Sequence, residues 1–595
     1  MTNSQKKVTP FQIIIILFFA GCLICTFSFS RQLIITFMEK LIGRELQEMT
    51  KWNAVITGSM SFFAFCAVTL YYFLYIPVGK TVRKDIFERT KSVYKNDHFA
   101  KHLIILFLIL LTAYAAILRA NYDFFDDMKR IISGHKSWVG ASRYVSEICS
   151  VFLHTNFYLN DISPLSQIIA LAICALTAYI LCYILTGGKI TYLTLAASSL
   201  FALCPYYIEN MSFKFDSPYM AMAVLFAVLP FLFKENHKAF ISVSIIGLIL
   251  VMSSYQAANS VYIILAIICT LETILFENDV KKAFKFAGIA VLCFIIALVI
   301  FRLFIMIPTE ATIDERNTHI EKSQMLSLVL SNLSAYLKTV TFRYGNIWSK
   351  LFTVIIFILF PFTGAINSKA FEGKHFAKFY SFGLSLAALI LMYLLSFGAY
   401  LIIGNTLIYD RAFMGFDILI AVTALFCVFF INQKKALKIT AGICVICLLY
   451  GFMVQATVAG NLYSKQKKYE EFRYTILLKD LSEIIDSSQK NKLLLDGEIG
   501  YATKTHMEHD NYNFVSIGSV TSGWAKYILQ DWNMDLDYLQ IEASSDRIAR
   551  NPEFTKLKET LPVIKDTYYH KICGQDNIYY VYLKNPQVKE YEIKE

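Results

Sequence analysis

Long apolar runs constrain this chain more than any other feature of its sequence. A stretch of about 18 apolar residues is enough to cross the hydrocarbon layer of a bilayer as a helix. Such runs recur along the chain as far as residue 459 and predict a mainly α, polytopic membrane protein. They predict about 13 membrane-spanning helices, near residues 10–29, 54–76, 102–119, 164–186, 190–208, 217–233, 239–256, 258–276, 286–307, 346–364, 379–403, 413–431 and 438–459.

The composition agrees with this class and excludes an ordinary soluble protein. Hydrophobic residues make up 56% of the 595 residues and charged residues only 17%. The formal net charge of +11 indicates how the membrane part is oriented and does not indicate a nucleic-acid partner.

The connections between the predicted spans carry uneven charge. Strongly basic connections occur at residues 80–101, 281–285, 367–378 and 433–438. Because short basic loops stay in the cytoplasm, we assign these four to the cytoplasmic side, and strict alternation of the spans satisfies all of them. The same alternation predicts a cytoplasmic N-terminus and places both the loop 120–163 and the C-terminal tail outside the cytoplasm.

Two domains are predicted. Residues 1–460 form the polytopic membrane domain. Residues 461–595 begin with a helical pattern and continue with short alternating or apolar runs, which favours a small extracytoplasmic α/β domain.

The polar loop 120–163 is the first candidate for the chemistry. Asp126 and Asp127 are adjacent, and Arg130 lies one helical turn after Asp126. A carboxylate there can take a proton from an attacking sugar hydroxyl, while Arg130 and Arg143 hold a phosphate in fork geometry. Two adjacent carboxylates could also hold Mg²⁺ or Mn²⁺. The alternative is a solvated loop whose charges pair with one another.

Trp138 in the same loop can stack on a sugar ring or a lipid tail. Further polar side chains are predicted at the same outer face. An alternative for residues 204–218 is an ordinary turn without a ligand. An alternative for the basic residues of the loop 308–345 is that their side chains snorkel to the membrane surface. The candidate donor- or acceptor-binding residues outside the first loop are Glu209, Lys214, Asp216, Gln256, Lys338, Arg343, Asp410 and Arg411.

A family resemblance rests on an ordered set of motifs. The loop reads YDFFDD-x-x-R-x-x-x-G-x-x-x-W, then SRYVSEI and DISPLSQIIALAI, and CPYYIENMSFKFDSP and SSYQAANSVY follow later. In this order the segments resemble the bacterial glucosyl transferase family of GtrII type.

The resemblance implies a membrane glycosyltransferase of GT-C type in the bacterial cytoplasmic membrane. It would move a sugar, glucose by the family's name, from a polyprenyl-phosphate carrier to a surface polysaccharide outside the cytoplasm. A flippase and a synthase of the lipid-linked sugar would be its partners. Asp126 or Asp127 would be the catalytic carboxylate, and Arg130 and Arg143 would contact phosphate or acceptor.

Two other functions fit parts of the pattern. A transporter or flippase of polysaccharide or lipid-linked sugar would also need many spans, but it predicts repeats and ionisable residues at span centres. A surface-polysaccharide polymerase shares lipid-phosphate chemistry, but it predicts a large outer loop late in the chain, whereas the large polar loop here is early.

Overall fold

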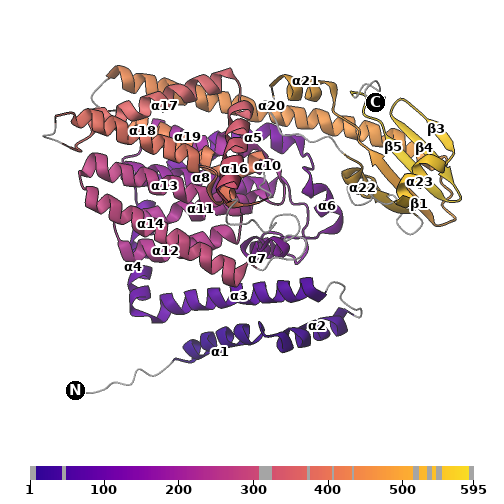
Figure 1. Ribbon diagram of the computed structural model, residues 1–595, viewed down its shortest axis with the longest axis horizontal. Helices are drawn as coiled ribbons and strands as arrows, with labels where there is room; N and C mark the ends of the chain where they lie inside the picture. The colour runs from indigo at the N-terminus through magenta and orange to yellow at the C-terminus, as the bar shows by residue number, and fades with distance from the viewer. Residues whose placement is uncertain are drawn as a thin grey trace.

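The computed structural model describes residues 9–42, 49–306, 325–371, 375–404, 408–431, 435–512, 521–532, 539–543 and 552–587. It consists of a bundle of apolar helices with a smaller α/β domain at one end (Figure 1). Most long helices run nearly parallel to one another, as expected where neighbouring spans pack side by side in a bilayer.

Among the described residues, the N-terminal half of the bundle contains helices and loops but no strand. Its helices are α1 (Pro10–Ile24), α2 (Ser28–Ile42), α3 (Met49–Tyr75), α4 (Pro77–Tyr94), α5 (Phe99–Ala120), α6 (Asp126–Ser133), α7 (Tyr144–Leu153), α8 (Leu165–Thr186), α9 (Tyr192–Leu203), α10 (Tyr207–Ser212), α11 (Ser217–Val228) and α12 (His237–Met252). The bundle is completed by α13 (Asn259–Glu272), α14 (Val280–Ile300), α16 (Met325–Arg343), α17 (Ile347–Asn367), α18 (Ala377–Leu395), α19 (Met414–Phe430) and the first part of α20 (Lys435–Ser482).

The count of 13 spans is only partly supported. Among the described residues, 8 helices are long and apolar enough to cross a membrane, or up to 9 if the bent pair formed by α1 and α2 is one span. The other predicted spans coincide with the shorter apolar helices α9, α11, α12 and α19. Nearly all of α19 is buried. A helix enclosed by other helices need not cover the hydrocarbon thickness by itself, which accounts for its shortness.

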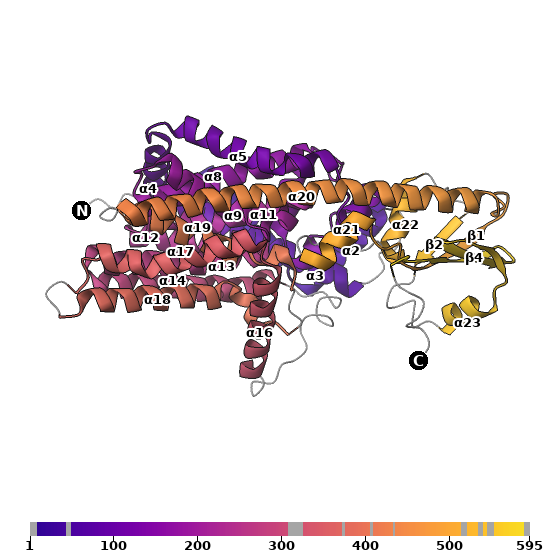
Figure 2. The ribbon, with the colours of Figure 1, turned by 90° about the horizontal axis from the view of Figure 1, so that it is seen from above.

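The two ends of the bundle differ in character. The α/β domain lies at the same end as α6 and α7, whereas α4 lies crosswise at the opposite end (Figure 1). The helix ends next to the other basic connections, namely the end of α17 and the starts of α14, α18 and α20, also lie at the α4 end (Figures 1 and 2). The four basic connections therefore share one end, and the first polar loop and the tail share the other, as the charge pattern predicted.

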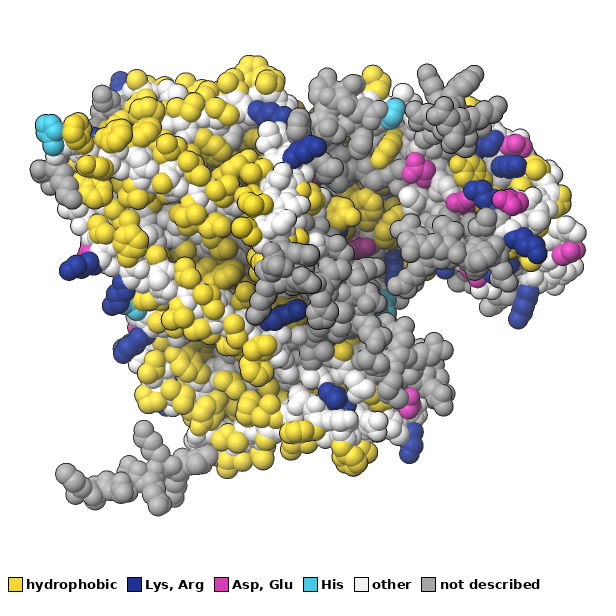
Figure 3. All heavy atoms as spheres, viewed as in Figure 1, with side chains coloured by type: hydrophobic (Ala, Val, Ile, Leu, Met, Phe, Trp, Pro, Cys, Tyr) yellow, Lys and Arg dark blue, Asp and Glu magenta, His cyan; other side chains and the backbone are white. Residues whose placement is uncertain are grey.

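The surface has the same division. Hydrophobic side chains cover the visible face of the bundle, while acidic and basic side chains gather on the α/β domain (Figure 3). This apolar face fits a multi-pass membrane protein.

Helix α20 joins the two domains. It is 48 residues long, which corresponds to about 70 Å at 1.5 Å per residue, and it runs from the bundle into the α/β domain (Figure 2). The predicted last span and the predicted first helix of the tail are thus one uninterrupted helix.

A five-stranded sheet completes the α/β domain, in the order β2-β1-β5-β4-β3. Strand β1 is parallel to both neighbours, for example with Leu493 opposite Ile541 and Tyr579, whereas β4 is antiparallel to β3 and β5. The strands are β1 (Asn491–Gly497), β2 (Leu539–Ala543), β3 (Val563–Asp566), β4 (His570–Gln575) and β5 (Ile578–Leu583), and the helices are α21 (Thr503–Tyr512), α22 (Ser522–Asp531) and α23 (Pro552–Thr560).

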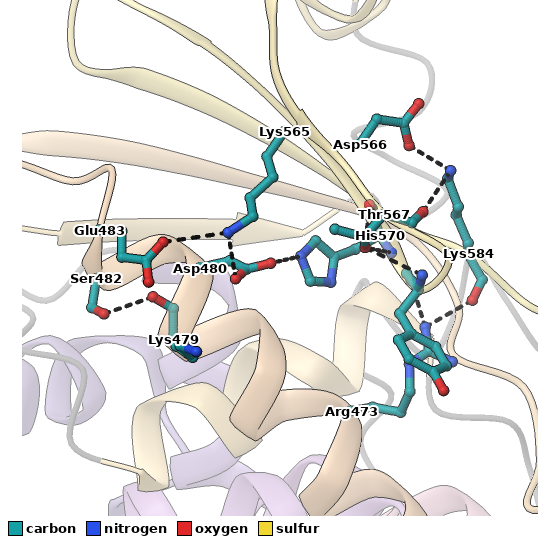
Figure 4. A network of polar contacts seen from close by, with 11 residues as sticks. Arg473, Lys479, Asp480, Ser482, Glu483, Lys565, Asp566, Thr567, His570 and Lys584 are labelled. Carbon is teal, nitrogen blue, oxygen red and sulfur yellow. Dashed lines mark hydrogen bonds and ion pairs between the residues drawn. The ribbon is translucent and has the colours of Figure 1, made fainter.

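Buried polar contacts fasten the end of α20 to this sheet (Figure 4). Asp480 pairs with the ring of His570 at 2.9 Å and with the Lys565 ammonium at 2.7 Å. Arg473 donates to the backbone carbonyls of Tyr569 and Lys584 at 2.6 and 2.8 Å. Because a buried guanidinium with several acceptors is costly to displace, α20 and the sheet form one unit.

Candidate active site

Helix α6 is the short element that carries the two adjacent aspartates. Asp126 and Asp127 occupy its first turn, where carboxylates are favoured by the exposed backbone N–H groups of a helix start. The helix ends at Gly134, whose φ of +60° lies in the left-handed region that glycine adopts at low cost. A helix therefore begins at these aspartates, and its first turn leaves Asp126 exposed and Asp127 buried.

Asp127 points into the protein and is fully buried. Its Oδ2 accepts the backbone N–H of Lys214 at 2.9 Å and that of Phe124 at 3.4 Å. Burial raises the pKa of Asp127 to about 7, although Arg130 and the Lys214 contact oppose that shift. Asp127 thus connects α6 to the segment before α11.

Asp126 is exposed on the same turn. Its charge acts on the guanidinium groups of two arginines that belong to different segments, Arg130 and Arg411. Asp126 is therefore accessible to solvent and lies in a positively charged environment.

Arg130 is tied to a residue far away in the sequence. Its guanidinium forms an ion pair with Asp216 and lies over the Trp138 ring at 5.0 Å. The Trp138 indole N–H donates to the other Asp216 oxygen at 2.7 Å, and its ring packs against Tyr219. Trp138 is only 1% exposed, so its ring lies inside this network, away from where a sugar ring or a lipid tail would stack.

Lys214 forms a second buried contact beside α6. Its ammonium pairs with Asp123 and lies 3.6 Å from Asp161. Together with the Arg130 pair, this contact holds the first polar loop against the segment between α10 and α11.

Arg143 and Gln256 meet at the same end of the bundle. The Arg143 Nε donates to the Gln256 side-chain oxygen at 3.2 Å, and the Gln256 amide donates to the carbonyl of Ala141 at 2.8 Å. The Arg143 guanidinium also lies over the Tyr255 ring at 4.7 Å. These contacts fix the direction of a partly exposed guanidinium.

Arg411 is held by Glu209 through two hydrogen bonds. Its backbone N–H and its guanidinium donate to the two oxygens of Glu209 at 3.0 and 2.6 Å. Burial lowers the pKa of Arg411, but Glu209, Tyr255 and Asp126 raise it more, so that its pKa lies above the usual range. Arg411 therefore stays cationic, and the negative charge of Asp126 contributes to this.

The remaining predicted residues are less closely connected to this group. Asp410 precedes Arg411 in a short 3-10 helix that contacts α10. Lys338 is exposed on α16, a helix that lies crosswise to the spans (Figure 2). The side chain of Arg343 lies outside the described residues.

Asp417 is a buried carboxylate outside the polar segments that the sequence motifs indicate. It lies in the first turn of α19, is fully buried and interacts with the Cys204 thiol. The available signal was an acidic residue at the start of a long apolar run, where ionisable groups are costly and often functional.

The α/β domain is in direct contact with α6. Met128 belongs to the hydrophobic cluster of that domain together with Tyr474, Leu477 and Leu529. The Phe125 and Trp524 rings lie 6.1 Å apart. The residues on either side of the aspartate pair are therefore packed against the tail.

No group of three or more His, Cys, Asp or Glu side chains in the described part of the chain is arranged to hold a metal ion. Asp126 is exposed whereas Asp127 is fully buried, an arrangement that does not favour one ion bound by both carboxylates.

Comparison with known proteins relates the part of the chain that contains these residues to a known protein family. The family model described as glucosyl transferase GtrII matches residues 115–428. A protein of Salmonella phage P22, described as an uncharacterized 55.3 kDa protein in the gtrB 5′ region, is 28% identical over 185 residues. That match covers 31% of this chain and 38% of the phage protein. No solved structure matches the chain.

Proposed function

Because the chain belongs to the glucosyl transferase GtrII family, we propose that it transfers a glucosyl group from a polyprenyl-phosphate carrier to a surface polysaccharide. The reaction would take place at the extracytoplasmic face of the bacterial cytoplasmic membrane. A flippase and a synthase that supply the lipid-linked sugar would be partner proteins. The observation that carries the proposal is that Asp126 is exposed on α6, while two partly exposed arginines, Arg143 and Arg411, are held in place by Gln256 and Glu209.

Asp126 is the proposed general base. It is exposed, whereas Asp127 is fully buried with one oxygen already occupied by two backbone N–H groups. A general base must come within hydrogen-bond reach of the proton that it removes. Of the two candidates, only Asp126 offers an accessible oxygen, and Asp127 is a positioning residue.

Arg143 and Arg411 are the proposed phosphate contacts. Both guanidiniums are partly exposed and are held by neighbouring side chains, Gln256 and Glu209 respectively. Arginine suits this role because its planar fork matches phosphate oxygens. In the proposed step, Asp126 takes the proton of the acceptor hydroxyl while that oxygen bonds to the anomeric carbon. The bond from that carbon to the phosphate oxygen breaks, and the polyprenyl phosphate leaves with the electron pair.

A lipid-borne donor fits the surroundings of the first polar loop. Phe152 near the end of α7 and Phe157 and Tyr158 in the loop after it are 77%, 79% and 67% exposed. Exposed aromatic side chains of this kind are typical of the interface between membrane and water. They would keep the loop at the depth where a lipid phosphate lies.

The test is the composition of the surface polysaccharide in cells that lack the protein and are then supplied with variants. We expect loss of the protein to remove a glucose side chain without changing polymer length. The wild-type protein and Asp127→Asn should restore it, the latter in part, and Asp126→Asn should not. Full restoration by Asp126→Asn would overturn the assignment of the base, and a change in polymer length alone would favour a polymerase.

A further inference from the structure

A polar cavity lies between the first polar loop and the α/β domain. Its volume is about 250 Å³, and it is lined by the loop and α6 on one side and by α20 and α22 on the other. Pockets for larger ligands are about 300–1,000 Å³. This cavity therefore has room for a single sugar ring and not for an extended chain.

Four acidic groups line the cavity, and two of them, Glu470 and Asp123, are fixed in direction. Glu470 of α20 is 6% exposed and accepts the Tyr122 hydroxyl at 2.8 Å. Asp123 is held by the Lys214 ammonium. Asp531 faces them from α22, and burial followed by the charge of Asp123 raises its pKa. Glu471 adds a further carboxylate to the α20 wall.

Aromatic side chains complete the walls. Tyr527 and Trp532 lie on the α22 side and are partly buried. An aromatic ring offers a flat apolar face and, in tyrosine and tryptophan, a polar group at its edge. Flat apolar faces beside oriented carboxylates match a sugar ring, whose hydroxyls donate hydrogen bonds and whose C–H groups pack on the aromatic ring.

The charge of the cavity indicates whether it suits the sugar acceptor or the phosphate-bearing donor. Its lining includes the carboxylates Asp123, Glu470, Glu471 and Asp531 and the single ammonium of Lys467. Burial raises the pKa of Glu470 to about 8, so this group holds a proton near pH 7, and the Lys214 ammonium balances Asp123. Glu471 and Asp531 still outnumber the Lys467 ammonium, and this remaining negative charge disfavours a phosphate. The described acidic side chains also do not converge as metal ligands. The occupant that fits is a neutral saccharide.

We propose that this cavity is a subsite for one sugar residue of the acceptor polysaccharide, a residue that lies a short distance along the chain from the reacting one. The inference rests on the proposed function, since it takes the acceptor to be a polymer. Met128 and Ile131 present one face of α6 to the cavity, while Asp126 precedes them on a different face of the same helix. The polymer would pass from the cavity around α6 to Asp126. The α/β domain then has a role in selecting the acceptor.

The test uses the full-length protein in detergent and, as the probe, the surface polysaccharide from cells that lack this protein. Binding is measured by calorimetry, and transfer is measured with polyprenyl-phosphate glucose. The double variant Asp531→Asn, Glu471→Gln removes the charge and one acceptor oxygen from each of two exposed carboxylates at nearly unchanged side-chain size, and we expect it to raise the Kd for the polysaccharide about tenfold or more. The KM for the lipid-linked donor should stay unchanged.

Two further variants make the outcome decisive. Glu559→Gln changes an exposed carboxylate of α23 in the same domain and should bind like the wild type. Asp126→Asn should keep polysaccharide binding and lose transfer. The proposal is overturned if the wild type does not bind the polysaccharide or if the double variant binds it as tightly. If the wild type binds through this cavity but transfers no glucose, the subsite stands and the proposed reaction fails.

Discussion

The backbone N–H of Lys214 donates to the Asp127 carboxylate across 2.9 Å, and this bond joins two segments 87 residues apart. Lys214 also pairs through its ammonium with Asp123, in the same loop as Asp127. One residue thus fixes both ends of the short acidic stretch. The direction of Asp126 follows from this, because a helix turn that buries Asp127 leaves its neighbour on another face.

Removal of the Asp127 side chain should destabilise the protein. Asp127→Ala leaves the buried N–H of Lys214 without its acceptor, and an unsatisfied buried donor costs about 1–3 kcal/mol. Asp127→Asn keeps an oxygen in place and should cost less. Thermal unfolding in detergent, followed by circular dichroism, measures the difference. Asp126→Ala is the matched control because Asp126 is exposed, and equal midpoints for Asp127→Ala and Asp126→Ala would contradict this role.

The same carboxylate predicts a pH dependence of stability. Burial raises the pKa of Asp127 to about 7 from an ordinary value of 3.8. Between these values the folded protein keeps a proton that the unfolded chain has lost, so the contribution of Asp127 to stability falls as pH rises from about 4 to about 7. It is complete below the unfolded pKa and absent above the folded one. Unfolding midpoints of the wild type should therefore decline over this window relative to those of Asp127→Asn. Parallel curves for the two proteins would show that Asp127 does not titrate there.

Local sequence patterns predicted the elements better than the contacts between them. The apolar runs located the long helices because burial of apolar residues in lipid and protein is encoded in consecutive positions. The spacing placed Arg130 one helical turn after Asp126 and suggested a phosphate contact, yet Arg130 forms an ion pair with Asp216. Residue spacing along one helix contains no information about a charge 86 residues away.

The predicted domain boundary at residue 460 is a second case in which a local sequence pattern did not reveal the three-dimensional arrangement. Polarity changes there because α20 leaves the apolar bundle, so hydropathy suggested a domain boundary, whereas the backbone hydrogen bonds of the helix continue unchanged. The burial of Trp138 was likewise not predictable, since its partners Asp216 and Tyr219 come from α11 and the residue before it. Aromatic residues in polar loops are equally suited to ligands and to small buried clusters.

Replacement of Arg143 should weaken the donor interaction without unfolding the protein. Arg143→Lys keeps the charge but loses the planar fork and the Nε that donates to Gln256. A hydrogen bond between charged groups contributes about 1.5–3 kcal/mol, so we expect kcat/KM for polyprenyl-phosphate glucose to fall by about tenfold to a hundredfold. Lys129→Arg, a change at an exposed position of α6, is the control and should have no effect. An unchanged kcat/KM for Arg143→Lys would remove Arg143 from the site.

The packing of Met128 predicts that the α/β domain supports the active site. Met128 is 6% exposed and lies in the hydrophobic cluster of that domain. Met128→Ala should lower the free energy of unfolding by about 2–5 kcal/mol if the cavity that it leaves does not collapse. Met507→Ala removes a methionine of the same domain that is 49% exposed, and its effect should be within about 0.5 kcal/mol. Because Met128 follows Asp126 by two residues, the loosened contact should also reduce glucose transfer in membranes where the variant is fully folded. Unfolding midpoints and transfer rates for the two methionine variants test both effects, and equal values would mean that α6 holds Asp126 in place without the tail.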